Sequence, residues 1–256
     1  MNTVTVGQVE IGVGAPKIIV SLIGHDESEL LDSARRYRLL PCDLIEWRAD
    51  FLNEALIQPH TLTSIGQALK AILPQPLIFT LRTKAEGGLR QIPPDRYSAA
   101  NLAMIDAKIP DLIDIELYSG YALFNPLREA ARQRNIGVIA SNHDFRHTPN
   151  QAEIVKRLTA MRDLGADIVK IAVMPQKRKD VLTLISAALS FLETPNPPPV
   201  IAVSMGELGR VSRLLAGEFG FAATFASVDN TISAPGQLDV HAVKTVLDLL
   251  NNKAML

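Results

Sequence analysis

The stretch DIVKIAV, Asp167–Val173, is almost entirely apolar, and PPVIAVSM, Pro198–Met205, repeats the pattern further along the chain. A strand with one face in water alternates apolar and polar residues, whereas a continuous apolar run indicates a strand buried on both faces. Strands of that kind belong to parallel sheets whose two faces are covered. These stretches therefore predict a parallel α/β architecture.

Eight short apolar segments recur along the chain, with longer helical patterns between them. They are Lys17–Ile23, Asp43–Arg48, Leu77–Arg82, Asp111–Leu117, Gly137–Asn142, Asp167–Val173, Pro199–Met205 and Phe221–Ala226. Eight βα units in 256 residues favour a closed (β/α)8 TIM barrel, a fold of about 250 residues. A doubly wound open sheet is the alternative, but it usually has fewer strands. We expect residues 1–256 to form a single catalytic domain.

The ends of the chain's helical patterns carry capping residues. Asp26 and Asn150 precede amphipathic stretches and are suited to the N-cap position. Gly165 is suited to follow a helix C-terminus, and we expect the stretch that begins at Tyr121 to end in the same way at Gly137. Residues 2–12 alternate apolar and polar around Gly7, which predicts an N-terminal β-hairpin that closes the barrel bottom.

Composition excludes several classes of protein. No apolar run reaches the roughly 18–20 residues of a membrane span, and the N-terminus has no export-signal pattern. The net charge is -1, which gives no attraction to nucleic acid or to an anionic membrane. The one cysteine, Cys42, allows no internal disulfide, so we expect a reducing cytoplasm.

Lys170 is a charged residue inside a strand that is otherwise apolar. A lysine amine is a poor nucleophile at neutral pH unless desolvation and a nearby cation favour its uncharged form. An uncharged amine can form an imine with a ketone or aldehyde. The alternative is a structural lysine paired with a carboxylate across the barrel.

His143 follows a strand at the end where barrel enzymes carry their active sites. Imidazole moves protons near neutral pH, so His143 is a candidate general acid and base; the alternative is a hydrogen-bonded loop histidine. The remaining histidines, His25, His60, His147 and His241, lie in loop or helix patterns and are expected at the surface.

Further charged residues lie in or next to the predicted strands. Glu46 and Arg48 share one face of a strand, and Arg82 ends another, so the three could form a cup for hydroxyl groups and a carboxylate. Asp114 and Glu116 also share a face, but a structural ion-pair network is nearly as good an explanation for them.

Two segments near the last strands complete the candidate site. Arg213 falls in a helical pattern just after a strand, where an arginine and a helix N-terminus favour an anion, although a solvated surface arginine is the commoner case. TISAPGQL, Thr231–Leu238, follows the last strand and is either a lid over the barrel mouth or an ordinary connection. The chain lacks a Walker loop, a G-x-G-x-x-G loop and an H-E-x-x-H motif, so we infer no cofactor and no metal.

Taken in order, these stretches resemble the type I 3-dehydroquinate dehydratases of the shikimate pathway, over almost the whole chain. The matching stretches are EWRADF at Glu46, LRTKAEGG around Arg82, DIEL at Asp114, VIASNHD around His143, IVKIAVMP around Lys170, SMGELGRVSRLLAGEFG from Ser204 and SAPGQ at Ser233. Leu81 and Phe221 depart from the family pattern and affect packing only.

The resemblance implies a chemical role for each matching residue. Lys170 would form the imine with 3-dehydroquinate, and His143 would remove the neighbouring proton and pass it to the leaving hydroxyl. Glu86 resembles the carboxylate that positions His143. The resemblance also implies a homodimer that acts in chorismate and aromatic amino acid biosynthesis.

The family's substrate-binding residues have counterparts here as well. Arg213 would hold the ring carboxylate, and the residues expected to line the rest of the substrate pocket are Glu46, Arg48, Arg82, Ser233, Gln237 and Met205.

Three alternatives stay open at this point. A class I aldolase also uses a strand lysine, but it would usually carry a phosphate site near the last two strands, and SAPGQ is a poor phosphate cradle. A catalytically inactive barrel could act as a binding protein. The chain could also be one domain of a larger shikimate-pathway polypeptide.

Overall fold

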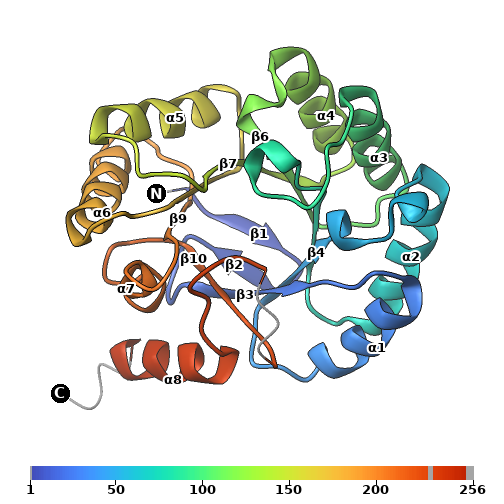
Figure 1. Cartoon of the computed structure of the whole chain (residues 1–256), viewed down its shortest axis with the longest axis horizontal. Coiled ribbons are helices and arrows are strands. Elements are labelled where there is room, and N and C mark those ends of the chain that lie inside the picture. Colours follow the sequence, from blue (N-terminus) through green and yellow to red (C-terminus); the bar gives the residue numbers. More distant parts are fainter. Residues whose placement is uncertain (1, 230–232, 252–256) are drawn as a thin grey trace.

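The computed structural model describes residues 2–229 and 233–251. Eight parallel strands form one sheet that is nearly closed into a barrel, with helices around its outside (Figure 1). The strands are β3 (Lys17–Leu22), β4 (Leu44–Arg48), β5 (Leu77–Thr80), β6 (Leu112–Glu116), β7 (Gly137–Asp144), β8 (Ile168–Val173), β9 (Val200–Ser204) and β10 (Ala223–Ala226). All eight predicted strands are confirmed, with their ends shifted by one or two residues, and the open doubly wound sheet is excluded.

Sequence order and spatial order agree around the barrel. The sheet runs from β10 through β3, β4, β5, β6, β7 and β8 to β9. The first and last strands of that order approach each other where the Ala222 N–H donates to the Val200 carbonyl at 2.8 Å. All the strands therefore point their carboxyl ends to the same mouth.

Helices lie on the outside of the barrel. They are α1 (Glu27–Tyr37), α2 (Pro59–Ile72), α3 (Pro94–Asp106), α4 (Tyr121–Gln133), α5 (Gln151–Asp163), α6 (Arg178–Leu192), α7 (Arg210–Leu214) and α8 (Val240–Asn251). Helices α1 to α7 connect successive strands, and α8 follows the last strand. Three short 3-10 turns follow strands β4, β5 and β6: η1 (Ala49–Phe51), η3 (Lys84–Glu86) and η4 (Leu117–Ser119). A fourth, η2 (Glu54–Leu56), precedes α2. Among the described helices, none has both the length and the apolar character that crossing a membrane requires.

The predicted helix caps are mostly confirmed. The Asp26 side chain accepts from the Glu29 N–H, the Asn150 side chain accepts from the Glu153 N–H, and Gly165 has a φ of +77° after α5. The prediction that α4 ends at Gly137 is wrong.

Helix α4 ends at Gln133 instead, and Asn135 takes the left-handed conformation with a φ of +59°. Asparagine tolerates that conformation better than most residues, so it replaces the expected glycine. Gly137 begins β7, where an added Cβ would lie 2.6 Å from Cδ2 of Leu112.

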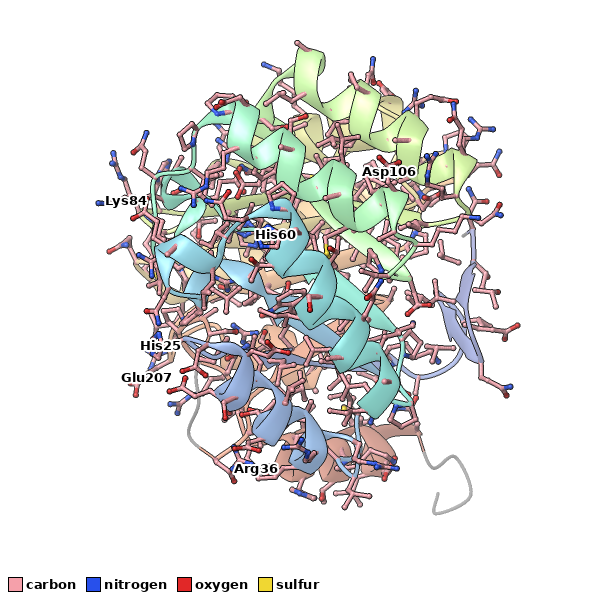
Figure 2. The ribbon with its side chains drawn as sticks, turned by 90° about the vertical axis from the view of Figure 1, so that its right-hand side faces the viewer. His25, Arg36, His60, Lys84, Asp106 and Glu207 are labelled. Carbon is pink, nitrogen blue, oxygen red and sulfur yellow. The ribbon has the colours of Figure 1, made fainter. Side chains whose placement is uncertain are left out.

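The predicted hairpin is confirmed as β1 (Val4–Val6) paired with β2 (Val9–Ile11). Val6 and Ile11 are buried in the same apolar cluster as the residues inside the barrel. Figure 2 shows the hairpin at one end of the barrel, whereas Lys84, His25 and Glu207 lie at the opposite end. The hairpin therefore closes the end away from the mouth.

The barrel interior changes from apolar to polar toward the mouth. The first inward residue of each strand is apolar and buried: Ile19, Leu44, Ile78, Leu112, Ile139, Ile168, Ile201 and Ala223. Two residues further along, six strands carry a buried polar residue instead: Ser21, Glu46, Thr80, Asp114, Ser141 and Lys170. Because buried polar groups are costly unless paired, this layer must form a connected network, and that network is the floor of the candidate site.

Candidate active site

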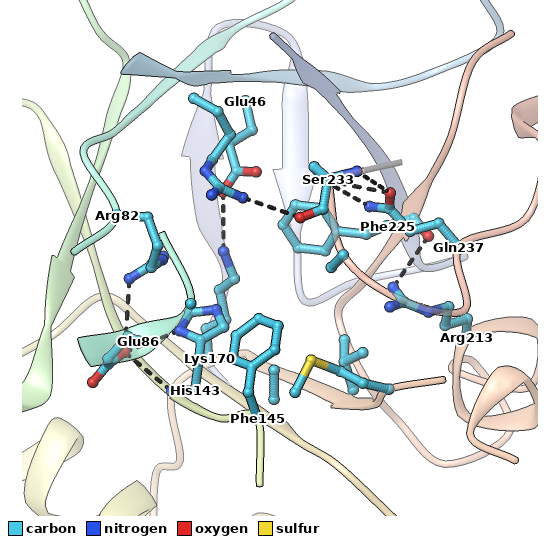
Figure 3. A pocket seen from close by; sticks show the side chains of 16 residues that line it. Glu46, Arg82, Glu86, His143, Phe145, Lys170, Arg213, Phe225, Ser233 and Gln237 are labelled. Atoms are coloured by element: carbon cyan, nitrogen blue, oxygen red, sulfur yellow. Dashed lines mark hydrogen bonds and ion pairs between the residues drawn. The ribbon is translucent and has the colours of Figure 1, made fainter. Parts of the chain in front are cut away.

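A pocket of about 460 Å³ opens at the mouth of the barrel (Figure 3). The ten residues predicted as site residues all line it: Glu46, Arg48, Arg82, Glu86, His143, Lys170, Met205, Arg213, Ser233 and Gln237. Alternate residues of parallel strands face the interior, which is why positions far apart in the sequence meet here.

Lys170 lies in the middle of β8, with 5% of its surface exposed. Its Nζ donates to Oε1 of Glu46 at 3.0 Å and to Oδ2 of Asp114 at 3.1 Å, and it lies 4.5 Å from the centre of the Phe225 ring. A nearby cation would favour the uncharged amine, but two carboxylates contact Nζ instead. The pairing across the barrel expected of a structural lysine is present, and the same side chain also lines the pocket.

The two carboxylates beside Lys170 are ionised. Burial would raise the pKa of Glu46, but Lys170 and Arg48 lower it below its usual value. Burial would likewise raise the pKa of Asp114, and there Arg82 and Lys170 lower it. Both therefore accept hydrogen bonds from the amine that lies between them as negatively charged groups.

Arg82 connects the carboxylates of the floor. Its Nη2 lies 2.8 Å from Oδ2 of Asp114, and its Nη1 lies 3.1 Å from Oε1 of Glu116 and 3.8 Å from Oε2 of Glu86. Burial would lower the pKa of Arg82, but these carboxylates raise it well above its usual range. The guanidinium is thus permanently charged and already paired within the protein.

His143 lies at the mouth end of β7 and is held by Glu86. Its Nδ1 lies 3.0 Å from Oε2 of Glu86, and its backbone N–H donates to the same oxygen at 3.0 Å. The other oxygen of Glu86 accepts from Nδ2 of Asn142 at 3.0 Å. This contact fixes the ring's orientation and leaves Nε2 as the nitrogen that can serve a ligand.

The pKa of His143 is lowered and the pKa of Glu86 is raised. Burial, followed by Arg82, Lys170 and Arg48, lowers the pKa of His143 well below its usual value. Burial together with Glu116 and Asp114 raises the pKa of Glu86 to about 8, although Arg82 and Asn142 oppose the rise. The imidazole is therefore uncharged near neutral pH, as a base must be.

Phe145 packs beside the His143 ring. The two rings stack with their centroids 6.5 Å apart, and Phe145 lines the pocket. Gly87 has a φ of +86°, and a Cβ built on it would collide with the Phe145 ring. Gly87, the first glycine of RTKAEGG, therefore allows the loop that carries Glu86 to approach this ring closely.

The pocket's other two arginines differ in their partners. Arg48 makes a bidentate pair with Asp50, at 2.8 Å and 2.9 Å. Arg213 is buried, with 1% of its surface exposed, and donates only to the carbonyls of Phe225 and Pro235, at 3.5 Å and 3.1 Å. No described carboxylate pairs with it, and burial lowers its pKa to about 10. Arg213 is thus a buried cation that still lacks an anion.

The predicted lid segment contacts the rim of the pocket. Thr231 and Ile232 lie outside the described residues. Ser233 Oγ donates to Oγ of Ser21 at 2.8 Å, and the Ser233 carbonyl accepts from Nη1 of Arg48 at 3.5 Å. A Cβ on Gly236 would collide with the backbone of Gly206, so the loop rests directly on the β9–α7 connection.

The predicted set lacked two residues that line the pocket, Phe145 and Phe225. It also lacked three residues that contact the lining from behind: Asp114, Ser21 and Asp50. The period-two alternation in DLIDIEL placed Asp114 on an inward face, and that signal could have assigned it to the site. His25, His60, His147 and His241 are exposed, as predicted. No group of three or more His, Cys, Asp or Glu side chains within residues 2–229 and 233–251 is arranged to hold a metal ion.

Comparison with known proteins agrees on one family. A sequence model described as "Type I 3-dehydroquinase" matches residues 18–254. A 3-dehydroquinate dehydratase from Salmonella agona (strain SL483) is 43% identical over 251 residues, which cover 98% of this chain and 99% of the relative.

Solved structures give the same result. The type I 3-dehydroquinate dehydratase from Clostridium difficile, with covalently modified comenic acid, superposes with a TM-score of 0.93 at 37% identity, covering 98% of both chains. The 3-dehydroquinate dehydratase from Geobacillus kaustophilus HTA426 superposes with a TM-score of 0.93 at 32% identity, covering 99% of this chain and 98% of that one.

Proposed function

This chain belongs to the type I 3-dehydroquinase family, and from that premise we propose that it dehydrates 3-dehydroquinate to 3-dehydroshikimate through an imine on Lys170, with His143 as acid and base. The observation that carries the proposal is the register of β7 and β8. Lys170 is level with Ser141, and His143 is level with Ala172, the next inward residue after Lys170. The nucleophile and the base therefore face the same pocket from neighbouring strands, with His143 two residues closer to the mouth than the level of Lys170.

The first step needs an uncharged amine. Lys170 gives a proton to Asp114 or Glu46, whose oxygens lie 3.1 Å and 3.0 Å from Nζ. The nitrogen then attacks the ketone carbon and the C–O π bond opens. The carbonyl oxygen takes up one hydrogen of the amine and the proton held by the carboxyl, and it leaves as water when the protonated imine forms. The imine draws electrons from the neighbouring carbon and makes its C–H acidic.

In the second step His143 moves one proton from a ring carbon of the substrate to the hydroxyl group that leaves. Nε2 of His143 takes the proton from the carbon beside the imine, and the C–H electron pair forms an enamine. The same imidazolium then protonates the leaving hydroxyl, and the C–O bond breaks to release water and form a conjugated double bond. Hydrolysis of the imine restores Lys170 and frees the product. Glu86, 3.0 Å from Nδ1, stabilises the imidazolium between the two transfers.

Arg213 is the best candidate for holding the substrate carboxylate. Arg48 and Arg82 already pair with protein carboxylates, whereas Arg213 contacts only carbonyl groups. A buried guanidinium of this kind gains most from an incoming anion. Glu46, Arg48, Arg82, Ser233, Gln237 and Met205 would then surround the hydroxyl-bearing ring, with the 233–237 loop as its lid.

The wider assignments are also proposals. Residues 1–256 would act as one catalytic domain, as a cytoplasmic homodimer that makes precursors of chorismate and the aromatic amino acids. Sedimentation equilibrium of the purified protein tests the dimer, because a monomer mass near 27.9 kDa would contradict it.

Borohydride reduction in the presence of 3-dehydroquinate tests the mechanism. We expect a stable adduct that mass spectrometry maps to Lys170, and no adduct in Lys170→Ala. An adduct that persists in Lys170→Ala would mean that another residue is the nucleophile. Product absorbance separates this reaction from that of a class I aldolase, because only dehydration creates a conjugated enone. An inactive barrel would give neither adduct nor absorbance.

A further inference from the structure

A second cavity of about 630 Å³ lies next to the pocket, between the loop that follows β5 and the loop that follows β6. Glu86 lines both cavities, and no other described residue does. In Figure 3, Glu86 lies on one side of Lys170, whereas Ser233, Gln237 and Arg213 lie on the other. Glu86 therefore separates the substrate pocket from a second space on the side away from the lid loop.

The second cavity leads from a buried floor to an exposed rim. Glu86, Glu116 and Tyr97 form the floor, each with 4% or less of its surface exposed, whereas Ala85 and Tyr118 at the rim are exposed. The space that the centres of water molecules can occupy in this cavity is about 190 Å³, and one water needs about 10–15 Å³ of such space, so there is room for several. Water that enters at the rim can therefore approach Glu86 without passing through the substrate pocket.

A bound substrate closes the other route to Glu86. This step rests on the proposed function, in which the ring of 3-dehydroquinate fills the first pocket. The 233–237 loop crosses that pocket's mouth, where Ser233 contacts both Ser21 and Arg48. With substrate beneath the loop, His143 and the pocket face of Glu86 lose their contact with bulk water.

His143 can act as a base only after the His143–Glu86 pair has lost any extra proton that it holds. His143 can act as a base through Nε2 only if Nδ1 carries the hydrogen that faces Glu86, and the carboxyl must then be ionised. The charged groups facing Glu86 are Arg82 after β5, Asp114 and Glu116 on β6, and His143 on β7. Together with burial they raise the pKa of Glu86 to about 8, so near neutral pH the pair holds a proton that has to leave.

We propose that the second cavity is the path by which Glu86 releases its proton to water, and takes one back, while substrate occupies the first pocket. The O–H bond of the carboxyl breaks, water in the second cavity accepts the proton, and the carboxylate then accepts the Nδ1 hydrogen of His143. Glu86 is a positioning residue that also passes protons to solvent, and the loops after β5 and β6 supply its solvent connection.

Hydrogen exchange at His143 tests this path in enzyme whose first pocket is blocked. The probe is the borohydride-reduced adduct with 3-dehydroshikimate, made with 15N-histidine and followed by NMR in D2O. Ala85→Phe places a ring at the rim of the second cavity without removing a side-chain hydrogen bond, and Ser119→Phe fills it from the opposite loop. Ala122→Phe is the matched control, because Ala122 is exposed nearby on α4 but lines neither cavity.

We expect the ring N–H of His143 to exchange in the wild-type and Ala122→Phe adducts, and to exchange several-fold more slowly in both cavity-filling variants. Equal rates in all four proteins, or a fully protected proton in the wild-type adduct, would overturn the proposed path. A failure to form the adduct would instead contradict the imine mechanism. The His143 exchange rates of the same four proteins, measured with 3-dehydroshikimate bound non-covalently, would then test the path by the same criterion.

Discussion

Oδ2 of Asp114 lies 3.1 Å from Nζ of Lys170, and the same oxygen lies 2.8 Å from Nη2 of Arg82. One buried carboxylate oxygen thus faces both the proposed nucleophile and a guanidinium that cannot lose its proton. Ser141 donates to the other oxygen of Asp114 at 2.5 Å. Asp114 is held from three sides, so its position beside the amine is fixed before substrate arrives.

Replacing Asp114 with asparagine keeps the shape of this residue but removes a proton acceptor from Lys170. We expect imine formation to slow by about 10²-fold, the lower range for loss of a general base. Rapid-quench borohydride trapping measures the rate directly. Glu116→Gln is the matched control, since Glu116 also pairs with Arg82 but does not contact Lys170. Equal trapping rates in the two variants would remove Asp114 from the chemistry.

Replacing His143 with alanine separates the two halves of the reaction. Lys170 keeps both of its carboxylate contacts, so the imine should still form and be trapped. Proton removal loses its base, and turnover should fall by about 10²–10⁴-fold. Mass spectrometry of the trapped adduct, together with absorbance of the enone, reports the two halves separately. Near-normal dehydration by this variant would assign the base to another residue.

The pH dependence of kcat/KM should reflect the His143–Glu86 pair. The pKa of Glu86 is raised to about 8, so the pair holds the extra proton below that pH and loses it as the pH rises. Only the deprotonated pair presents a free Nε2, and kcat/KM should therefore rise with pH through about 8 and then level off. A pH–rate profile measures this limb.

Glu86→Gln is the control for that profile, because it keeps a hydrogen-bonding group but removes the carboxyl that titrates. We expect lower activity throughout and no rise near pH 8 in the variant. If the rise persists unchanged, the titrating group is not Glu86.

Replacing Arg213 with alanine removes the buried cation proposed to bind the ring carboxylate. Hydrogen bonds to charged groups contribute about 1.5–3 kcal/mol, which corresponds to a rise in KM of about 10- to 150-fold. Arg210→Ala is the matched control on the same helix, since Arg210 is exposed and contacts only Glu207. Steady-state kinetics with 3-dehydroquinate test this, and an unchanged KM in Arg213→Ala would assign the residue to stability.

The sequence predicted the barrel well because its fold signals are local. Each strand is an apolar run, and the caps at Asp26 and Asn150 act within one helical turn. The misplaced end of α4 has a local cause too: Asn135 adopted the conformation expected of a glycine. Closure of the sheet into a barrel has no local signal in the sequence, so it was inferred from the number of strands.

The site was predicted only in part, since partners depend on three-dimensional arrangement. All ten predicted residues line the pocket, and strand position and family resemblance suffice for that. Spacing could not indicate that Asp114 faces Lys170 from two strands away, or that Asp50 neutralises Arg48. Nor could spacing indicate that, of the three arginines lining the pocket, Arg213 is the one without an acidic partner.

The two carboxylates around Nζ of Lys170 have a consequence for the energy of the reaction cycle. The ammonium group and the protonated imine carry the same unit of positive charge at almost the same point. Glu46 and Asp114 can therefore stabilise the covalent intermediate with dipoles and ion pairs that are already oriented, and little reorganisation energy is needed when the carbon–nitrogen bond forms. The free amine and the enamine are neutral at that nitrogen, so the fixed field of the two carboxylates favours the return of each to a cation.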